Sequence, residues 1–173
     1  RLYVSPKTEE PERSPIEVHK IENGMWVNRA NTEEARYIVE LLKTFFAERK
    51  NDETIGIITF NITQRDLIDD LIDEECAKNP EFASRIRAEL VRKRDGEDIG
   101  LFVKNIESVQ GDERDIMLIS WAYAQNSYPQ SLIFLQKPNL FNVAITRARY
   151  KTINFISKNI FKTTPLAIIT GKK

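Results

Sequence analysis

Two short apolar runs constrain the fold of this 173-residue chain more than any other feature of its sequence. They occupy residues 55–60 and 116–123, and polar residues bound each run. Runs of this length are typical of strands whose two faces are both buried, as in a parallel sheet. Segments with helical apolar spacing alternate with them. This alternation predicts an α/β fold, with a mainly parallel sheet and helices on both faces.

Caps, turn dipeptides and spacing predict the remaining elements. Asn31 and Asn61 each stand three residues before a Glu or Gln, at Glu34 and Gln64, which is the capping pattern of a helix N-terminus. Residues 124–137 fit no single element. The other predicted elements are a short hairpin over 16–28 around Asn23-Gly24, an exposed helix within 77–99 ending near Asp95-Gly96, strands at 101–106 and 152–157, and a helix at 138–149.

Composition narrows the function classes. Lys and Arg together number 26, as do Asp and Glu, so any site for a polyanion has to be a local patch. The single cysteine, Cys76, excludes a disulfide framework within the chain and indicates a reducing compartment. With His19 as the only histidine, no metal site is predicted. No apolar stretch is long enough to span a membrane, so a cytoplasmic protein without membrane contact is expected.

The chain divides into one domain with two flanking segments. Residues 1–15 contain three prolines and few apolar residues, and we expect a linker or mobile arm there. Residues 16–160 form the expected domain, and residues 161–173 a C-terminal tail. Because the first residue is Arg1 rather than Met, we expect a piece cut from a longer protein.

A polar turn centred on Gly111 directly precedes the second apolar run. Glycine lets the backbone approach a ligand closely, and Ser108 and Gln110 offer hydrogen-bond donors. Glu113 offers an acceptor suited to sugar hydroxyls. The alternative is a tight surface turn whose charges are only solvated, which is the commoner case for a polar loop. Asp112 and Arg114 fit that alternative.

A second cluster of polar residues lies in the predicted helix over 138–149. On a helix, Asn142, Thr146 and Arg149 fall near one face, and Arg147 is rotated about 100° away from Thr146. Apolar residues wrap much of the remaining surface. A guanidinium beside a buried helix normally has an anionic partner, although both arginines could also be ordinary surface residues.

A third candidate site lies where the first apolar run meets a helix, at residues 59–61. A strand end followed by a helix N-terminus binds phosphate readily, because its free N–H groups and the helix dipole favour an anion. Alternatively, Asn61 and Gln64 only cap the helix. Both interpretations stand at this point, and one residue can serve both.

These three segments, in this order, resemble the second RecA-like domain of superfamily 1 helicases. The resemblance rests on residues 55–64, 106–115 and 142–149, covers about residues 16–160, and lies in the branch of the nonsense-mediated-decay and Okazaki-fragment helicases. Residues 102–115 are most similar to large bacterial helicase-like proteins, some of which carry an added nuclease-like domain. The resemblance implies a three-layer RecA-like P-loop NTPase fold with a mainly parallel sheet.

The resemblance also implies a role for individual residues. Arg147 matches the arginine finger that reaches the γ-phosphate of ATP across an interdomain cleft. Gln110, Gly111 and Glu113 match the motif that links nucleotide to nucleic acid, with Glu113 near the ribose or the Mg-phosphate region. Arg149 falls on the same nucleotide side. The residues implied to contact nucleic acid are Thr59, Asn61, Gln64, Ser108 and Thr146.

Two departures limit what the chain can do alone. No Gly-x-x-x-x-Gly-Lys-Ser/Thr occurs, so ATP and Mg are expected to be bound mainly by a first RecA-like domain of the same polypeptide, and the isolated chain should be inactive. Residues 138–141 also replace a basic residue that the family often has there. The implied partner is a single strand, with DNA favoured over RNA.

Two other function classes compete with a helicase motor. One is a non-catalytic, helicase-shaped module that binds nucleic acid or protein. The other is a different Rossmann-like enzyme such as a methyltransferase, which the lack of a Gly-rich loop after the first strand disfavours.

Overall fold

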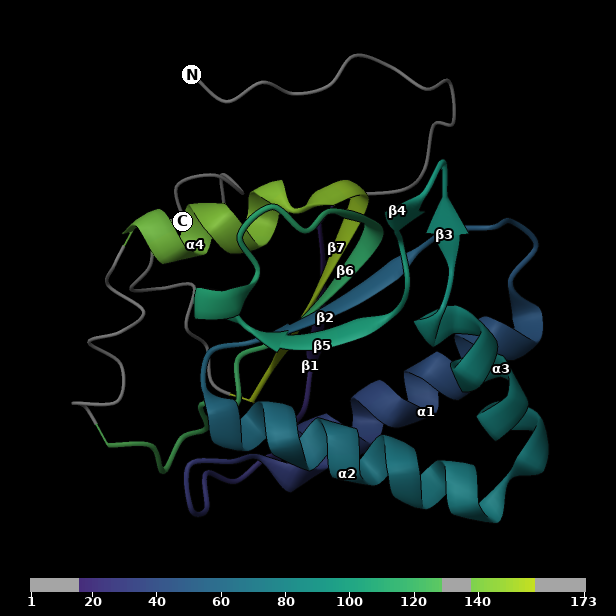
Figure 1. Ribbon diagram of the computed structural model, residues 1–173. Coiled ribbons are helices and arrows are strands. Elements are labelled where there is room, and N and C mark those ends of the chain that lie inside the picture. The colour runs from purple at the N-terminus through teal and green to yellow at the C-terminus, as the bar shows by residue number, and fades with distance from the viewer. Residues whose placement is uncertain (1–15, 129–137, 158–173) are drawn as a thin grey trace.

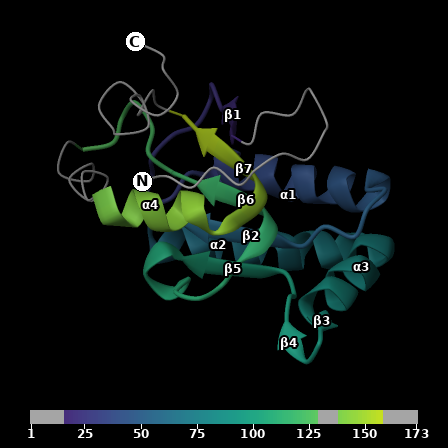
Figure 2. The same cartoon turned by 90° about the horizontal axis from the view of Figure 1, so that it is seen from above.

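The computed structural model describes residues 16–128 and 138–157, and these form a sheet covered by helices on both faces (Figure 1). Five parallel strands lie in the order β1-β7-β6-β2-β5. Figure 2 shows this order from β1 at one side to β5 at the other. The strand bounds are β1 Ile16–Lys20, β2 Ile55–Thr59, β5 Phe102–Asn105, β6 Arg114–Ser120 and β7 Ala148–Ile156.

The two apolar runs form the buried centre of the sheet, as predicted. Every residue of β2 and of β6 is buried. β2 and β6 are neighbours in parallel register, with Ile57 opposite Leu118 and Thr59 opposite Ser120. Both faces of these strands are covered, which explains why their sequences show no polar–apolar alternation.

Helices make up the two outer layers. Helices α1 (Thr32–Glu48), α2 (Ile62–Lys78) and α3 (Pro80–Leu90) lie on one face of the sheet. Helix α4 (Pro138–Thr146) lies on the other face with the short 3-10 helix η1 (Ile106–Ser108), which it contacts. The predicted three-layer α/β fold with a parallel sheet is therefore confirmed.

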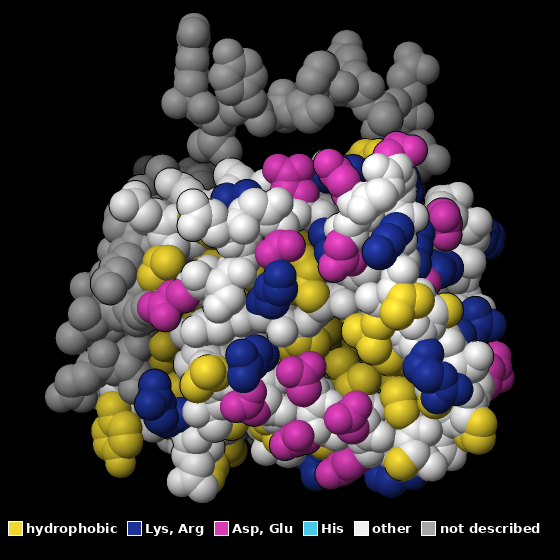
Figure 3. Space-filling model, viewed as in Figure 1, with side chains coloured by type: hydrophobic (Ala, Val, Ile, Leu, Met, Phe, Trp, Pro, Cys, Tyr) yellow, Lys and Arg dark blue, Asp and Glu magenta, His cyan; other side chains and the backbone are white. Residues whose placement is uncertain are grey.

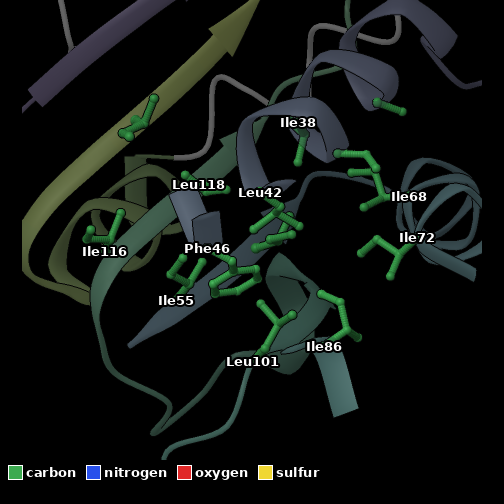
Figure 4. Packing of buried hydrophobic residues seen from close by; sticks show 14 of the residues in the cluster. Ile38, Leu42, Phe46, Ile55, Ile68, Ile72, Ile86, Leu101, Ile116 and Leu118 are labelled. Carbon is green, nitrogen blue, oxygen red and sulfur yellow. The ribbon is translucent and has the colours of Figure 1, made fainter. Parts of the chain in front are cut away.

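The larger core lies between the sheet and helices α1 to α3 (Figure 4). Ile38, Leu42 and Phe46 follow one another along α1 at helical spacing and are almost fully buried. They pack against residues of the central strands and of α2 and α3, which Figure 4 labels: Ile55, Ile68, Ile72, Ile86, Ile116 and Leu118.

Both predicted caps are present. The Asn31 side chain accepts a hydrogen bond from the Glu34 backbone N–H (3.1 Å), and the Asn61 side chain accepts one from Gln64 (2.9 Å). Each bond satisfies one of the free N–H groups at a helix start. The capping residues fix where α1 and α2 begin.

The hairpin predicted over residues 16–28 is wrong. β1 pairs in parallel with β7, and it has no antiparallel partner among the described residues. The chain after Asn23-Gly24 instead closes a smaller loop through a bridge between Val27 and Ala30. The pairing of β1 depends on a strand more than a hundred residues away, which local sequence cannot indicate.

The third helix ends earlier than predicted. α3 stops at Leu90, and Asp95-Gly96 forms the turn of a small hairpin between β3 (Lys93–Arg94) and β4 (Glu97–Asp98). Asp95 and Gly96 both have positive φ, 53° and 82°, as such a turn requires. The helix is also only partly exposed, since Phe82 and Ile86 are buried.

The last helix ends earlier, and the last strand begins earlier, than predicted. α4 ends at Thr146, and β7 begins at Ala148 rather than at residue 152. Arg147 is therefore in the turn between them and Arg149 is in a strand, so their predicted arrangement on a helix is wrong. The cause is pairing of Ala148 with Arg114 at the start of β6.

Oppositely charged side chains are interspersed on the face seen in Figure 3. Within the described ranges, no helix combines the length and apolarity needed to cross a membrane. The predicted linker over residues 1–15 and tail over 161–173 lie outside the described residues.

Candidate functional site

The residues singled out from the sequence lie at two opposite edges of the sheet. All five strands are parallel, so their last residues share one edge, here named the carboxyl edge, which includes Thr59 and Ser120. Their first residues share the amino edge, where β6 begins after Glu113 and β7 begins after Arg147. The candidate residues therefore form two groups and not one pocket.

The amino edge brings the polar turn and the arginine segment together. The Arg114 backbone N–H donates to the Arg147 carbonyl oxygen (3.1 Å). The Glu113 carboxylate lies 3.8 Å from Nε of Arg149, with both side chains about half exposed. An exposed pair at this distance contributes little stability, so both groups remain available to a ligand.

Arg147 carries a nitrogen that lacks a partner. Its Nε is buried and has no hydrogen-bond partner among the described residues. A buried donor without a partner costs about 1–3 kcal/mol, so Arg147 gains from a movement that brings this nitrogen to an anion. A phosphate oxygen fits this requirement, because the guanidinium donates to phosphate through a planar, forked set of N–H groups.

Gly111 has a conformational role in the turn. Its φ is +86°, in the left-handed region that glycine adopts without strain. A Cβ built there meets no described atom within 4 Å, so among the described residues no close neighbour explains why a glycine stands here. The backbone beside Gly111 is thus open to an external group, and Gln110 and Gly111 are both exposed.

The interpretation of Asp112 and Arg114 as solvated charges is wrong for Arg114. That side chain is only 4% exposed; its Nε donates to the Gly100 carbonyl (2.8 Å), and its guanidinium lies over the ring of Phe102. Asp112 pairs with Lys104 at 2.7 Å. These contacts anchor the turn at both ends and fix the position of Glu113.

At the carboxyl edge, Thr59 and Asn61 form a small hydrogen-bonded unit. The Thr59 hydroxyl donates to the Asn61 carbonyl oxygen (2.8 Å), and Asn61 caps α2. Asn61 Nδ2 is buried without a hydrogen-bond partner in the described part of the chain. Beside the first turn of a helix, such a donor can bond to a phosphate oxygen once a movement uncovers it.

Gln64, also predicted to contact nucleic acid, is fully buried. Its Oε1 accepts from the Asn31 backbone N–H (2.7 Å), and its Nε2 donates to Asn31 O (3.2 Å) and to Ser120 Oγ (3.0 Å). The side chain therefore joins the starts of α1 and α2 to the end of β6. The structure places it under the carboxyl edge rather than on its surface.

Ser108 and Thr146 are exposed but lie apart from each other in the fold. Ser108 is in η1, directly after β5 ends at the carboxyl edge. Thr146 is the last residue of α4, next to Arg147 at the amino edge, and its hydroxyl donates to the Asn142 carbonyl (2.7 Å). Thr146 is therefore not brought together with Thr59 and Asn61.

Sequence reasoning missed Glu34, which organises the carboxyl edge. This carboxylate is fully buried and accepts hydrogen bonds from Ser120 Oγ (2.6 Å) and from the Ala122 backbone N–H (2.8 Å). Burial raises the pKa of Glu34 to about 7, although these hydrogen bonds act in the opposite direction. The bond to Ala122 holds a non-glycine residue at φ 63°.

The capping pattern concealed this role of Glu34. A Glu at its position normally turns back to the N-cap backbone N–H. Here Gln64 takes that N–H, and Glu34 points to β6 instead. The apolar residues Ala35 and Ile38, one and four positions after Glu34 and both buried, are the signal in the sequence that this Glu lies near an inward face.

The parallel sheet with helices on both faces defines the chain as a three-layer α/β domain. The model of the family described as "AAA domain" matches residues 8–159, and the chain belongs to that family. The match spans all the residues that the structure describes.

Relatives with helicase names extend this result. The chain is 40% identical over 138 residues to "Uncharacterized ATP-dependent helicase MG140 homolog" of Mycoplasma pneumoniae, and 42% identical over 136 residues to "Uncharacterized ATP-dependent helicase MG140" of Mycoplasma genitalium. Each match covers 78% of this chain and 12% of the relative. "Putative ATP-dependent RNA helicase ECM32" of Saccharomyces cerevisiae is 27% identical over 150 residues, covering 76% of this chain and 13% of that protein.

Among solved structures, the chain is similar to the C-terminal domain of a possible DNA helicase from Lactobacillus plantarum WCFS1. The sequence identity is 17%, the TM-score is 0.39, and the match covers 83% of this chain and 73% of the other. The resemblance to a helicase motor domain, based on three sequence segments, is confirmed by the family match and the Mycoplasma relatives. The chain spans about an eighth of the length of those relatives.

Proposed function

We propose that this chain is the C-terminal motor domain of an ATP-dependent superfamily 1 helicase or translocase. The observation that carries the proposal is the amino edge, where Arg147 has a buried nitrogen without a partner in the described ranges, beside the exposed Glu113 and Arg149. A cluster of this kind gains its partner when a phosphate group meets it. A protein used only as a scaffold has no need for such a group.

Arg147 serves as the arginine finger in this proposal. ATP and Mg, held mainly by a first RecA-like domain of the same polypeptide, supply the γ-phosphoryl group that is transferred to water. Arg147 donates to the phosphate oxygens as charge shifts onto them, and Arg149, 3.8 Å from Glu113, adds a second positive charge at this edge. Glu113 accepts from the ribose or orients the phosphate region, while the exposed Gln110 and Gly111 line the approach.

The carboxyl edge binds one strand of nucleic acid through its backbone. Asn61 Nδ2 and the first turn of α2 face a phosphate, and Ser108 adds an exposed hydroxyl. Thr59 and Gln64 position Asn61 from beneath, since both are fully buried. Contacts of this type do not depend on base sequence, as a translocating motor requires.

The segment 106–113 links the two edges. It leaves β5 at the carboxyl edge through η1 and reaches β6 at the amino edge after Glu113. Eight residues thus carry Ser108 at one end and Glu113 at the other. A shift of the segment when the nucleotide cleft closes would move both contacts together, which couples hydrolysis to movement along the strand.

The test of this function is an Arg147→Ala substitution in the full-length protein. Nucleic-acid-stimulated ATP hydrolysis should fall by about 10³-fold, while binding of ATP is largely retained. Arg85→Ala is the matched control, because Arg85 is an exposed arginine of α3 that pairs with Glu81. Turnover in Arg147→Ala equal to that of the control would remove the assignment.

The bound strand is proposed to be DNA rather than RNA, in a cytoplasmic protein. The support is the similarity of residues 102–115 to bacterial helicase-like proteins, whereas the yeast relative is named as an RNA helicase. Stimulation of ATP hydrolysis by DNA and RNA oligonucleotides of the same sequence separates the two. A stronger response to RNA would contradict the DNA proposal and leave the motor function standing.

A further inference from the structure

Two loops at the carboxyl edge are locked together by aromatic and amide contacts. Residues 25–30 follow β1, and residues 121–128 follow β6. The rings of Trp26 and Tyr123 are stacked, with centroids 4.9 Å apart and planes 18° from parallel. Asn126 Oδ1 accepts from the Trp26 backbone N–H, and Asn126 Nδ2 donates to Trp26 O, both at 2.8 Å. The two loops therefore form one rigid surface, here named the loop platform.

The loop platform exposes large apolar and aromatic side chains. Met25 is 55% exposed, Val27 58% and Tyr128 70%, and Trp26 is partly exposed beside them. Isolated exposed apolar residues need no explanation, but several on one rigid surface indicate a binding site.

Arg29 is held at the tip of the platform by a strained turn. The bridge between Val27 and Ala30 closes this turn with hydrogen bonds of 2.9 and 3.0 Å. Asn28 and Arg29 both have positive φ, 50° and 65°. Asparagine tolerates this region, whereas arginine at φ 65° is strained, and its side chain is exposed.

The charge of the platform favours an anionic ligand. Arg29 is the only charged residue in the two loops, although 26 of the 173 residues of the chain are acidic. The other side chains are aromatic, apolar or neutral polar. Aromatic rings beside an arginine, without any carboxylate, match the surfaces on which the bases of single-stranded nucleic acid stack.

The platform continues the strand-binding edge proposed above. Ser120, which ends β6 just before the second loop, is the register partner of Thr59. Trp121 stacks on Phe60, with centroids 4.3 Å apart, and Phe60 directly precedes Asn61. A strand whose phosphate lies at Asn61 therefore has the platform beside it on the same edge.

We propose that the loop platform stacks the bases of the single strand whose backbone is held at Asn61. This inference rests on the proposed helicase function and adds base stacking by Trp26 and Tyr128 to its backbone contacts. Arg29 contributes charge to the neighbouring phosphate. Stacking of this kind is tolerant of sequence, since every base has an aromatic face.

The test measures how tightly the full-length protein binds two fluorescein-labelled strands of equal length. One is oligothymidylate and the other is an abasic strand with the same backbone. Tyr128→Ala should weaken binding of oligothymidylate by about tenfold and leave the abasic strand unchanged. Tyr128→Phe should restore binding, because it keeps the ring. Val91→Ala is the control, since Val91 is an exposed apolar residue beyond α3.

Further variants separate this inference from the function on which it rests. Arg29→Gly relieves the backbone strain and removes the charge. It should therefore weaken the binding of both strands without loss of protein stability. Asn61→Asp should also weaken the binding of both strands, because its carboxylate repels phosphate. If Tyr128→Ala keeps the wild-type ratio of the two dissociation constants, the proposal that the loop platform stacks bases is overturned. A platform that binds a protein partner instead would give this same result. If the wild-type protein binds neither strand, the strand-binding function fails.

Discussion

Individual side chains divide into those that are satisfied within the chain and those that are not. Arg147 Nε and Asn61 Nδ2 are buried donors without partners among the described residues, one at each edge of the sheet. Gln64 and Glu34, by contrast, are fully buried with several hydrogen bonds each. Unsatisfied buried donors are costly, so they mark the places where a ligand has the most to add.

Glu34 should make the stability of the chain depend on pH. Its pKa is about 7 in the folded chain against 4.5 when exposed, so the unfolded chain ionises first as pH rises. The contribution of Glu34 to the free energy of unfolding is complete below pH 4.5 and is lost as pH rises through 7. Between pH 5 and pH 8, Glu34→Gln should lose about 1–3 kcal/mol less of its free energy of unfolding than the wild type does. Urea unfolding across this pH range measures the difference.

The matched control for this experiment is Glu33→Gln. Glu33 is the exposed neighbour of Glu34 and pairs with Arg36. That variant should keep the pH dependence of the wild type. An unchanged slope in Glu34→Gln would mean that the buried carboxyl does not titrate in this range.

Gly111 should matter more for activity than for stability. Gly111→Ala places a Cβ in open space at φ +86°, so the cost is backbone strain of about 1 kcal/mol. Gly96→Ala is an equivalent substitution, at φ +82° with no described atom within 4 Å. Unfolding should show similar losses for both, whereas ATP hydrolysis by the full-length protein should fall only for Gly111→Ala. Equal activities would exclude a functional role for the turn.

Elements were predictable where local sequence decides them. β2 and β6 are short apolar runs, and the caps at Asn31 and Asn61 mark the starts of α1 and α2. Elements that depend on distant pairing were not predictable. β1 pairs with β7, and β7 begins at Ala148 because that residue pairs with Arg114. The same pairing moves Arg147 out of the helix. The sequence therefore identified Arg147 as a candidate site residue but did not indicate its position in the fold.

The start of α2 offers a test that separates capping from ligand binding. Asn61→Asp keeps the oxygen that accepts from the Gln64 N–H, so α2 should retain its stability within a few tenths of a kcal/mol. Asn61→Ala removes that acceptor and should destabilise the chain by about 1 kcal/mol. Thermal unfolding of the two variants measures the difference. A comparable loss in both would indicate that the amide nitrogen, rather than the cap, stabilises this region.

The whole molecule presents only part of the proposed nucleotide site. The fold supplies Arg147 and Glu113 at the amino edge, but its sequence has no phosphate loop. The purified 173-residue chain should therefore fold and show no ATP hydrolysis above buffer, with or without a nucleic acid strand. Release of phosphate measures this directly. Activity that survives in the chain and disappears in Arg147→Ala would reveal a phosphate site that the sequence does not indicate.

The central claim is that the two edges divide the work of a motor. The most direct measurement compares Arg147→Ala and Asn61→Asp in the full-length protein, for both ATP hydrolysis and single-strand binding. Arg147→Ala should lose hydrolysis at every strand concentration and still bind the strand. Asn61→Asp should bind the strand more weakly and recover nearly full hydrolysis when the strand is in excess. Exchanged effects, or the same loss of both activities in each variant, would contradict this division.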